Sequence, residues 1–222
     1  MDILYSLRVG VPGSGPNGQR FNLLEGTRKV ARATTVDALG AVFATDLELT
    51  MAATTSRRLF VHAGVVGWRG RAIVLPGRSF SGKTTLVLAL VRAGARYYSD
   101  DFALLDAGGR VHPYTREPSV RPHGSDTGVR VPLTALGGRV GRKPLPVGLV
   151  LISEYQPDAA WQPEPLSPGA GALALLAHTV AARTQPAIAL TTLSAAVIQA
   201  TVLQGPRGDA ESVATTILSH IT

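Results

Sequence analysis

Short apolar runs, separated by Gly and Pro, dominate the first part of the chain. Residues 2–11 alternate loosely between apolar and polar and predict a strand, which a turn-rich stretch follows. Phe21–Leu24 and Lys29–Ala33 predict two more short strands around Gly26. From residue 35 to about residue 56 the apolar positions recur at near-helical spacing, which predicts a helix.

The next region predicts a β-hairpin followed by a helix. Leu59–Val66 and Ala72–Leu75 are apolar runs joined by a short loop, Gly67-Trp68-Arg69-Gly70. Lys83–Ala93 predicts a helix that ends at Gly94, a residue that tolerates the left-handed conformation of a helix C-terminus. Three short predicted strands follow: Arg96–Ser99, Phe102–Leu105 and Arg110–Tyr114.

The remainder predicts a long loop, a buried strand and helices. Residues 115–146 are rich in Pro, Gly and Arg and lack periodicity, so we expect a loop there. Residues 147–153 predict a buried strand, and Ser167-Pro168 predicts the start of a helix that runs to about Arg183. Residues 187–200 and 209–221 predict further helices. The expected fold class is α/β, with a β-rich N-terminal part and a helical C-terminal part.

The length fits one domain over residues 1–222, or one core with an appended lobe, and we take the single domain as the prediction. We divide it into N-terminal strands and a helix (1–56), a nucleotide-binding core (57–155) and a C-terminal helical region (156–222). The absence of cysteine excludes disulfides, thiolate metal sites and cysteine nucleophiles. The N-terminus lacks the pattern of a signal peptide, and no apolar run approaches the roughly 18 residues of a membrane span. We therefore expect a cytoplasmic protein without a membrane partner.

The net charge of +7 comes mostly from arginine, since only three of the 22 basic residues are lysine. Arginine suits bidentate contacts with phosphate and carboxylate groups, which favours an anionic ligand or an acidic partner. A general arginine bias of the genome would give the same composition. Aromatic residues make up only 5% of the chain and do not interleave with a basic cluster, so a nucleic-acid partner is not expected.

A phosphate-binding P-loop is the clearest motif in the chain. The Walker A pattern is matched residue for residue by Gly77-Arg78-Ser79-Phe80-Ser81-Gly82-Lys83-Thr84. The glycines let backbone N–H groups surround phosphate oxygens, Lys83 adds a positive charge, and the Thr84 hydroxyl can coordinate Mg²⁺. The following helix directs the positive end of its dipole at the same anion. We expect ATP with Mg²⁺ as the ligand, and a site that extends to Thr85.

Asp100 and Asp101, just after the predicted strand Arg96–Ser99, are the candidate acidic residues. A nucleotide site needs a carboxylate near its metal, and a transferase needs a base for the acceptor's proton. A strand that returned beside the P-loop strand would bring both carboxylates to the phosphates. Adjacent strand residues face opposite ways, so we expect two different roles. Asp100 joins Thr84 as a candidate metal ligand, either aspartate could be the base, and a solvated turn is the alternative.

His62, in the first strand of the predicted hairpin, is a further candidate. A lone histidine in a strand is more often a packed side chain without a chemical role. Alternatively, it could form a hydrogen bond with a catalytic aspartate and tune the pKa of that aspartate.

At these residues the chain resembles the catalytic domain of HPr kinase/phosphorylase. The resemblance rests on the strand segment His62-Ala63-Gly64-Val65-Val66, the P-loop, the helix ending at Gly94 and the pair Asp100-Asp101. It is specific between Val61 and Leu105 and extends from about Arg57 to Arg183. Phosphoenolpyruvate carboxykinases also carry a P-loop followed by two aspartates, and the compact HPr-kinase-like proteins, which include lasso-peptide kinases, resemble the chain more closely.

The resemblance implies a P-loop core in a mixed sheet of the HPr kinase and PEP carboxykinase type. It also implies that Lys83 and Thr84 bind phosphate and metal, that Asp100 or Asp101 is the catalytic base, and that His62 lies near it. Those kinases carry an arginine in a Pro-Gly-Arg-Asn segment ahead of a late helix, which Pro168-Gly169-Ala170-Gly171 lacks here. No counterpart of their glutamate-rich signature follows the aspartates, and Glu117 is the nearest acid.

The leading hypothesis is therefore an ATP-dependent phosphotransferase, a serine kinase that acts on a protein or peptide hydroxyl. Two alternatives stay open: a small-molecule kinase or carboxykinase-like enzyme, and a nucleotide-binding regulator without transfer chemistry. Four further points stay open: the identity of the acceptor, the choice between ATP and GTP, the existence of a phosphorylase reaction, and assembly into a homo-oligomer. Cations of the Pro-rich middle that could contact the acceptor or the γ-phosphate are Arg116, Arg121, Arg139, Arg142 and Lys143.

Overall fold

The computed structural model of the chain describes residues 3–10, 20–78, 81–120, 128–136 and 138–221. It divides into two compact units, an N-terminal unit (Met1–Thr54) and a core unit (Thr55–Thr222). This boundary lies close to the subdivision after residue 56 that the sequence suggested, and the interpretation as one domain stays a prediction. No helix among the described residues is long and apolar enough to cross a membrane.

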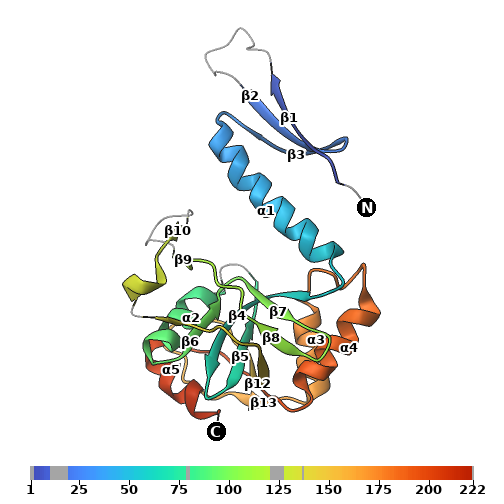
Figure 1. Ribbon diagram of the computed structural model, residues 1–222. Helices are drawn as coiled ribbons and strands as arrows, with labels where there is room; N and C mark the ends of the chain where they lie inside the picture. The colour runs from blue at the N-terminus through green and yellow to red at the C-terminus, as the bar shows by residue number, and fades with distance from the viewer. Residues whose placement is uncertain (1–2, 11–19, 79–80, 121–127, 137, 222) are drawn as a thin grey trace. The chain divides into compact units, whose positions relative to one another are not determined.

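The elements follow one another along the chain (Figure 1) as β1 (Tyr5–Gly10), β2 (Arg20–Glu25), β3 (Arg28–Ala33), α1 (Val36–Thr54), β4 (Leu59–Trp68), β5 (Arg71–Pro76), α2 (Lys83–Arg92), β6 (Arg96–Ser99), β7 (Phe102–Leu105), β8 (Arg110–His112), β9 (Ser119–Val120), β10 (Val129–Arg130), the 3₁₀ helix η1 (Leu133–Leu136), β11 (Arg139–Val140), β12 (Leu145–Ile152), β13 (Glu164–Pro165), α3 (Pro168–Leu176), α4 (Pro186–Val197), β14 (Thr201–Gln204) and α5 (Ala210–Ser219).

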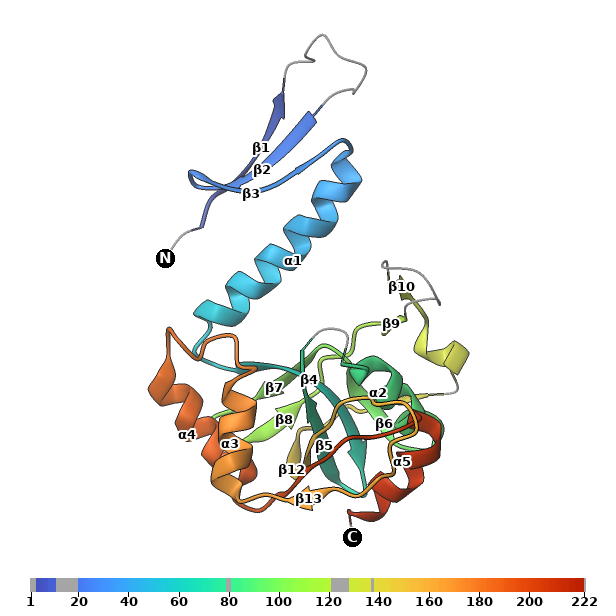
Figure 2. The ribbon, with the colours of Figure 1, turned by 180° about the vertical axis from the view of Figure 1, so that it is seen from behind.

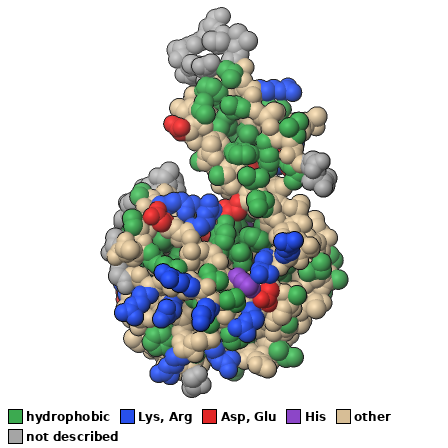
Figure 3. Space-filling model, viewed as in Figure 1, with side chains coloured by type: hydrophobic (Ala, Val, Ile, Leu, Met, Phe, Trp, Pro, Cys, Tyr) green, Lys and Arg blue, Asp and Glu red, His purple; other side chains and the backbone are tan. Residues whose placement is uncertain are grey.

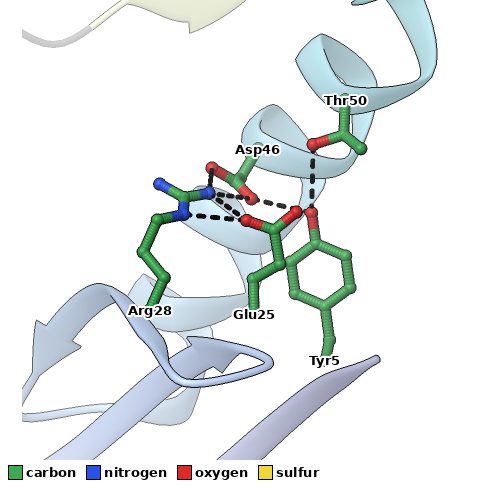
Figure 4. A network of polar contacts seen from close by, with 5 residues as sticks. All are labelled: Tyr5, Glu25, Arg28, Asp46 and Thr50. Carbon is green, nitrogen blue, oxygen red and sulfur yellow. Dashed lines mark hydrogen bonds and ion pairs between the residues drawn. The ribbon is translucent and has the colours of Figure 1, made fainter. Parts of the chain in front are cut away.

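The N-terminal unit is a three-stranded antiparallel sheet, in the order β1-β2-β3, with α1 packed against it. The Tyr5 ring meets the Phe43 ring edge-on at 4.9 Å between centroids, and the Tyr5 hydroxyl donates a 2.7 Å hydrogen bond to Asp46. Arg28 forms ion pairs with Glu25 and Asp46 (Figure 4). The apolar ring contact and the buried part of the sheet hold the helix, because such exposed ion pairs contribute only ~0–1 kcal/mol each.

The core unit has three layers, with a mixed sheet between two pairs of helices (Figures 1 and 2). On one face, Leu175 of α3 and Leu193 of α4 belong to a hydrophobic core that includes Val61 of β4. On the other face, Leu90 of α2 and Ile217 of α5 form a second core with strand residues. The expected α/β fold class is thus confirmed as a mixed sheet with helices on both faces.

Strand β4 organises the part of the sheet that carries the P-loop. It pairs antiparallel with both β5 and β6, so these two strands run in the same direction and end at the same edge of the sheet. β6 does not lie directly beside β5, because β4 lies between them and β12 occupies the other side of β5. The hairpin loop is also shorter than predicted. It is a two-residue turn in which Arg69 and Gly70 have φ of 45° and 77°, as in a type I′ turn.

The predicted strands, α1, α2 and the N-terminus of α3 at Ser167 are confirmed, and Gly94 has the expected positive φ of 107°. Residues 115–146, predicted as loop, contain β9, β10, η1 and β11 and the start of β12, so this prediction is wrong in part. Arg121 lies outside the described residues.

The predicted helix from Ser167 to Arg183 is too long, because α3 ends at Leu176. His178 and Val180 then form backbone hydrogen bonds with His62 and Phe60 of β4, and this pairing replaces further helical turns. The C-terminal region is not purely helical either. The short run β14 pairs with β12, from which it is distant in the sequence, and β13 pairs with β14.

Candidate phosphate-binding site

The predicted P-loop, residues 77–84, connects the end of β5 to the start of α2. Gly82, just before α2, has a left-handed conformation with φ 81° and ψ 16°, which L-residues rarely adopt. Gly77 N–H donates a 3.4 Å hydrogen bond to the His62 carbonyl of β4. Ser79 and Phe80, two of the predicted phosphate-binding residues, lie outside the described residues. The described part of the loop is therefore fixed at both ends, by strand pairing and by the helix.

Lys83 folds back over the loop that precedes it. Its Nζ donates hydrogen bonds to the backbone carbonyls of Gly77 (2.8 Å) and Arg78 (2.6 Å). The ammonium group is thereby held within the loop, where a phosphate bound by the loop amides would meet it. Thr85, the last residue predicted to belong to the site, is exposed on the first turn of α2.

Asp100 lies against the P-loop helix. The Thr84 hydroxyl donates a 3.0 Å hydrogen bond to Asp100 Oδ2, and the Tyr97 hydroxyl donates one of 2.7 Å to Oδ1. The backbone N–H of Ser119 also donates to Oδ2 over 3.3 Å. Burial raises the pKa of Tyr97, and the Asp100 charge raises it further, so the tyrosine remains a hydrogen-bond donor.

Asp101 has a different environment from Asp100. Its side chain is exposed, its backbone N–H donates to Ser99 Oγ over 3.1 Å, and its carbonyl accepts a 3.1 Å hydrogen bond from Ala63. Both aspartates lie in the bend between β6 and β7, so the premise that they occupy opposite faces of a strand is wrong. Their environments differ because of the residues that each contacts, and the expectation of two roles stays a prediction.

His62 lies beside the P-loop through its backbone and packs through its ring. Its backbone N–H donates to the His178 carbonyl over 2.8 Å, while its own carbonyl accepts from Gly77. The imidazole lies 4.4 Å from the Phe102 ring, centroid to centroid, at an interplanar angle of 34°. This ring contact agrees with the interpretation of His62 as a packed side chain. A role of His62 in tuning the pKa of a catalytic aspartate stays a prediction.

His178 is a candidate site residue that the sequence analysis missed. Burial lowers its pKa below the usual value for histidine. The positive charges of Lys83, His62 and Arg78 lower this pKa further. The His178 carbonyl accepts a hydrogen bond from His62 N–H, and the His62 carbonyl accepts one from Gly77, so backbone contacts connect His178 to the loop. His178 follows α3 within a turn, and no local motif identifies it, because only its pairing with β4 brings it to the site.

Arg207 is a second residue that was missed. Its side chain is only 2% exposed, and Nη2 donates a 2.9 Å hydrogen bond to the carbonyl of Gly82. A Cβ at Gly82 would lie 2.6 Å from this nitrogen, so the close approach requires glycine. Arg207 occurs in Pro206-Arg207-Gly208, just before α5. An arginine therefore precedes a late helix here, although it does not lie in the Pro168-Gly169-Ala170-Gly171 segment.

A small void lies behind the P-loop, and polar groups line part of it. Ser81, Lys83, Ser153 and Arg207 contribute to its wall. Within the described residues, Ser81 Oγ and Arg207 Nε are buried without a hydrogen-bond partner. Unpaired buried polar groups are costly, so this region of the loop retains capacity to bind a water or an anion oxygen.

The described residues fit a magnesium ion that is held chiefly by a nucleotide. They contain no cluster of three His, Asp or Glu side chains able to hold a metal by themselves. Mg²⁺ instead commonly uses one or two protein oxygens together with phosphates and water. The Thr84 hydroxyl and the Asp100 carboxylate, in mutual contact at the start of α2, are such a donor pair.

No family model and no curated protein matches the chain. Among solved structures, the chain matches the HPr(Ser) kinase/phosphatase from Coxiella burnetii with a TM-score of 0.42 and 16% sequence identity. The match covers 73% of this chain and 93% of that protein. A likeness of this extent establishes neither a common family nor a common activity.

Proposed function

We propose that the protein is a P-loop kinase that transfers the γ-phosphoryl group of ATP to a hydroxyl of a protein or peptide, serine in the leading case. The observation that carries this proposal is the contact between Thr84 and Asp100, since it joins the P-loop to a downstream carboxylate over 3.0 Å. A Walker A sequence with no acid beside its threonine would support nucleotide binding alone. The Asp100 carboxylate supplies, beside the Thr84 hydroxyl, the second protein ligand that a metal-nucleotide site needs.

In the proposed kinase, different residues bind the phosphates, hold the metal and accept the acceptor's proton. The loop amides and Lys83 bind the phosphates, and the buried charge of Arg207 behind Gly82 reinforces the positive potential there. Thr84 and Asp100 hold Mg²⁺, which would neutralise charge on the β- and γ-phosphates. Asp101, exposed next to Asp100, is then the candidate base.

In the transfer step, the acceptor oxygen forms a bond to the γ-phosphorus while the bond from that phosphorus to the β-phosphate bridging oxygen breaks. The acceptor's proton passes to the Asp101 carboxylate, and ADP leaves. Such reactions need mainly positioning and charge neutralisation from the protein. The regulator alternative rested on a missing arginine, and Arg207 is a candidate for that residue.

The experiment that tests this proposal is incubation with γ-labelled ATP, Mg²⁺ and a library of serine-, threonine- and tyrosine-containing peptides. Transfer to serine peptides that disappears in Lys83→Ala supports the proposal. ATP binding without transfer to any peptide, or to the protein itself, would favour the regulator instead.

A further inference from the structure

One side of the core unit carries a concentration of exposed cations, which we call the basic edge. It comprises Arg96 of β6, Arg110 of β8, Arg139 of β11, and Arg142 and Lys143 of the connection to β12. Figure 3 shows Lys and Arg side chains gathered on one face of the core unit. All five residues are exposed.

Backbone pairing brings these cations together from separate parts of the chain. β11 pairs in parallel with β6, and Arg139 is the register partner of Arg96. Gly141 N–H then donates to the Tyr97 carbonyl over 2.8 Å, which keeps Arg142 next to the same strand. The Arg110 side chain of β8 donates a 3.0 Å hydrogen bond to the carbonyl of Pro144, the residue after Lys143, and this bond holds Arg110 next to the other cations.

The basic edge is not neutralised within the described part of the chain. The ion pairs found there involve Arg28, Arg92 and His112, and none of the five cations of the edge takes part. Like charges at paired positions on neighbouring strands are destabilising, so the Arg96–Arg139 pair does not help the fold. An unpaired, repulsive group of cations is suited to an external anion.

The basic edge is separate from the phosphate-binding site. β6 begins at Arg96 and ends at Ser99, and Asp100 follows at the carboxyl end of the strand. The P-loop follows β5, which runs in the same direction. The edge is thus continuous with the amino-terminal end of β6, whereas the phosphate site lies at the opposite end. A γ-phosphate contact by Arg139, one of the roles that the sequence left open, does not follow from this placement.

We propose that the basic edge is a docking surface for an acidic segment of a partner protein. β11 is the last strand in the order of the sheet, and an extended chain running along it would bring every second side chain, as a carboxylate, to the cations. Nucleic-acid binding surfaces commonly add aromatic side chains on which bases stack. Among the large described hydrophobic side chains the well-exposed aromatic one is Tyr155, which lies beside Arg207 and not on the basic edge. Trp68 follows Gly67, the register partner of Arg96, but is only half-exposed, so the edge offers charge without a well-exposed aromatic ring, which favours an acidic polypeptide.

The test measures binding of a fluorescent glutamate-rich peptide by anisotropy over a series of salt concentrations. The test variant is Arg139→Glu/Arg142→Glu. The matched control, Arg57→Glu/Arg183→Glu, makes the same change in net charge at exposed positions outside the basic edge. We expect the test variant to weaken peptide binding by roughly tenfold or more, the control to change it by less than about twofold, and wild-type affinity to fall with added salt.

Equal loss of affinity in the two variants would overturn the proposal, because net charge alone would then explain binding. Tighter binding of a short DNA duplex than of the peptide, again lost in the test variant, would assign the edge to nucleic acid. Absence of wild-type peptide binding would also overturn it. The Mg-ATP-induced shift in melting temperature, measured on the same samples, shows separately whether each variant is folded and whether the nucleotide site exists.

Discussion

The Thr84 hydroxyl donates a 3.0 Å hydrogen bond to the Asp100 carboxylate, and this contact joins two segments that are distinct in the sequence. Thr84 belongs to the helix after the P-loop, whereas Asp100 follows β6. The two meet because β5 and β6 both run antiparallel to β4 and end at the same edge of the sheet. The proposed metal–nucleotide site depends on this arrangement.

Replacing Lys83 by Ala should remove ATP-induced stabilisation. The variant loses the charge that Nζ places within the loop. A ligand at a hundredfold excess over its Kd stabilises a folded protein by about 2.7 kcal/mol, so wild type should show a clear rise in melting temperature with Mg-ATP. Thermal unfolding with and without Mg-ATP checks this. Equal shifts in the two proteins would contradict the P-loop assignment, and Lys143→Ala serves as the control.

Asp100→Asn should weaken the dependence of ATP binding on Mg²⁺. An amide in place of the carboxylate keeps the shape and can still contact Thr84, but it removes the charge that attracts the metal. Titration of Mg²⁺ at fixed ATP should show at least a roughly tenfold rise in the Mg²⁺ concentration needed, about 1.4 kcal/mol. Asp106→Asn, in the turn before β8, is the control. An unchanged Mg²⁺ titration would exclude Asp100 as a metal ligand.

Arg207→Met should lower both stability and ATP affinity. The side chain is almost fully buried and binds the Gly82 carbonyl, so methionine retains much of the packing and loses the hydrogen bonds. The Gly82 carbonyl keeps the hydrogen bond that it accepts from Leu86 N–H, so the cost comes from the lost bonds of the guanidinium, about 1.5–3 kcal/mol for a hydrogen bond to a charged group. Urea unfolding and nucleotide titration measure the two effects, with exposed Arg183→Met as the control. Loss of stability with unchanged ATP affinity would restrict Arg207 to a structural role.

His178 should make stability depend on mild acid. Its pKa is lower in the folded protein than the ordinary histidine value, so the unfolded chain binds the proton more tightly. Its contribution to stability is therefore complete above the ordinary value of 6.5 and decreases as the pH falls from there toward the folded-state pKa. Urea midpoints at pH 7.5 and pH 5.5 should differ less in His178→Gln than in wild type. An identical pH dependence in both proteins would contradict this prediction.

Local signals in the sequence were sufficient for most elements of the core. The apolar run before Gly77 and the glycine after α2 predicted the strand and helix that hold the P-loop, because each depends on nearby residues. Asp100 could be proposed from its position after a short strand. The sequence could not show that β4 lies between β5 and β6, since strand order depends on pairing between distant segments.

His178 and Arg207 could not be identified from the sequence for the same reason. His178 reaches the site because the chain after α3 pairs with β4, and this pairing also ends the helix earlier than its apolar pattern suggested. Arg207 reaches Gly82 because β14 pairs with β12 and delivers the following turn behind the P-loop. Neither residue lies in a periodic pattern that identifies its partner.

The most direct test of the central claim compares Asp101→Asn with wild type in two measurements on the same preparation, the rate of phosphoryl transfer to a serine peptide and the Kd for Mg-ATP. Loss of a general base typically lowers a rate by ~10²–10⁴-fold. We predict a loss of this size with an ATP affinity within about twofold of wild type, because the Thr84 hydroxyl donates to Asp100, the proposed metal ligand. Transfer at the wild-type rate by Asp101→Asn would contradict the account.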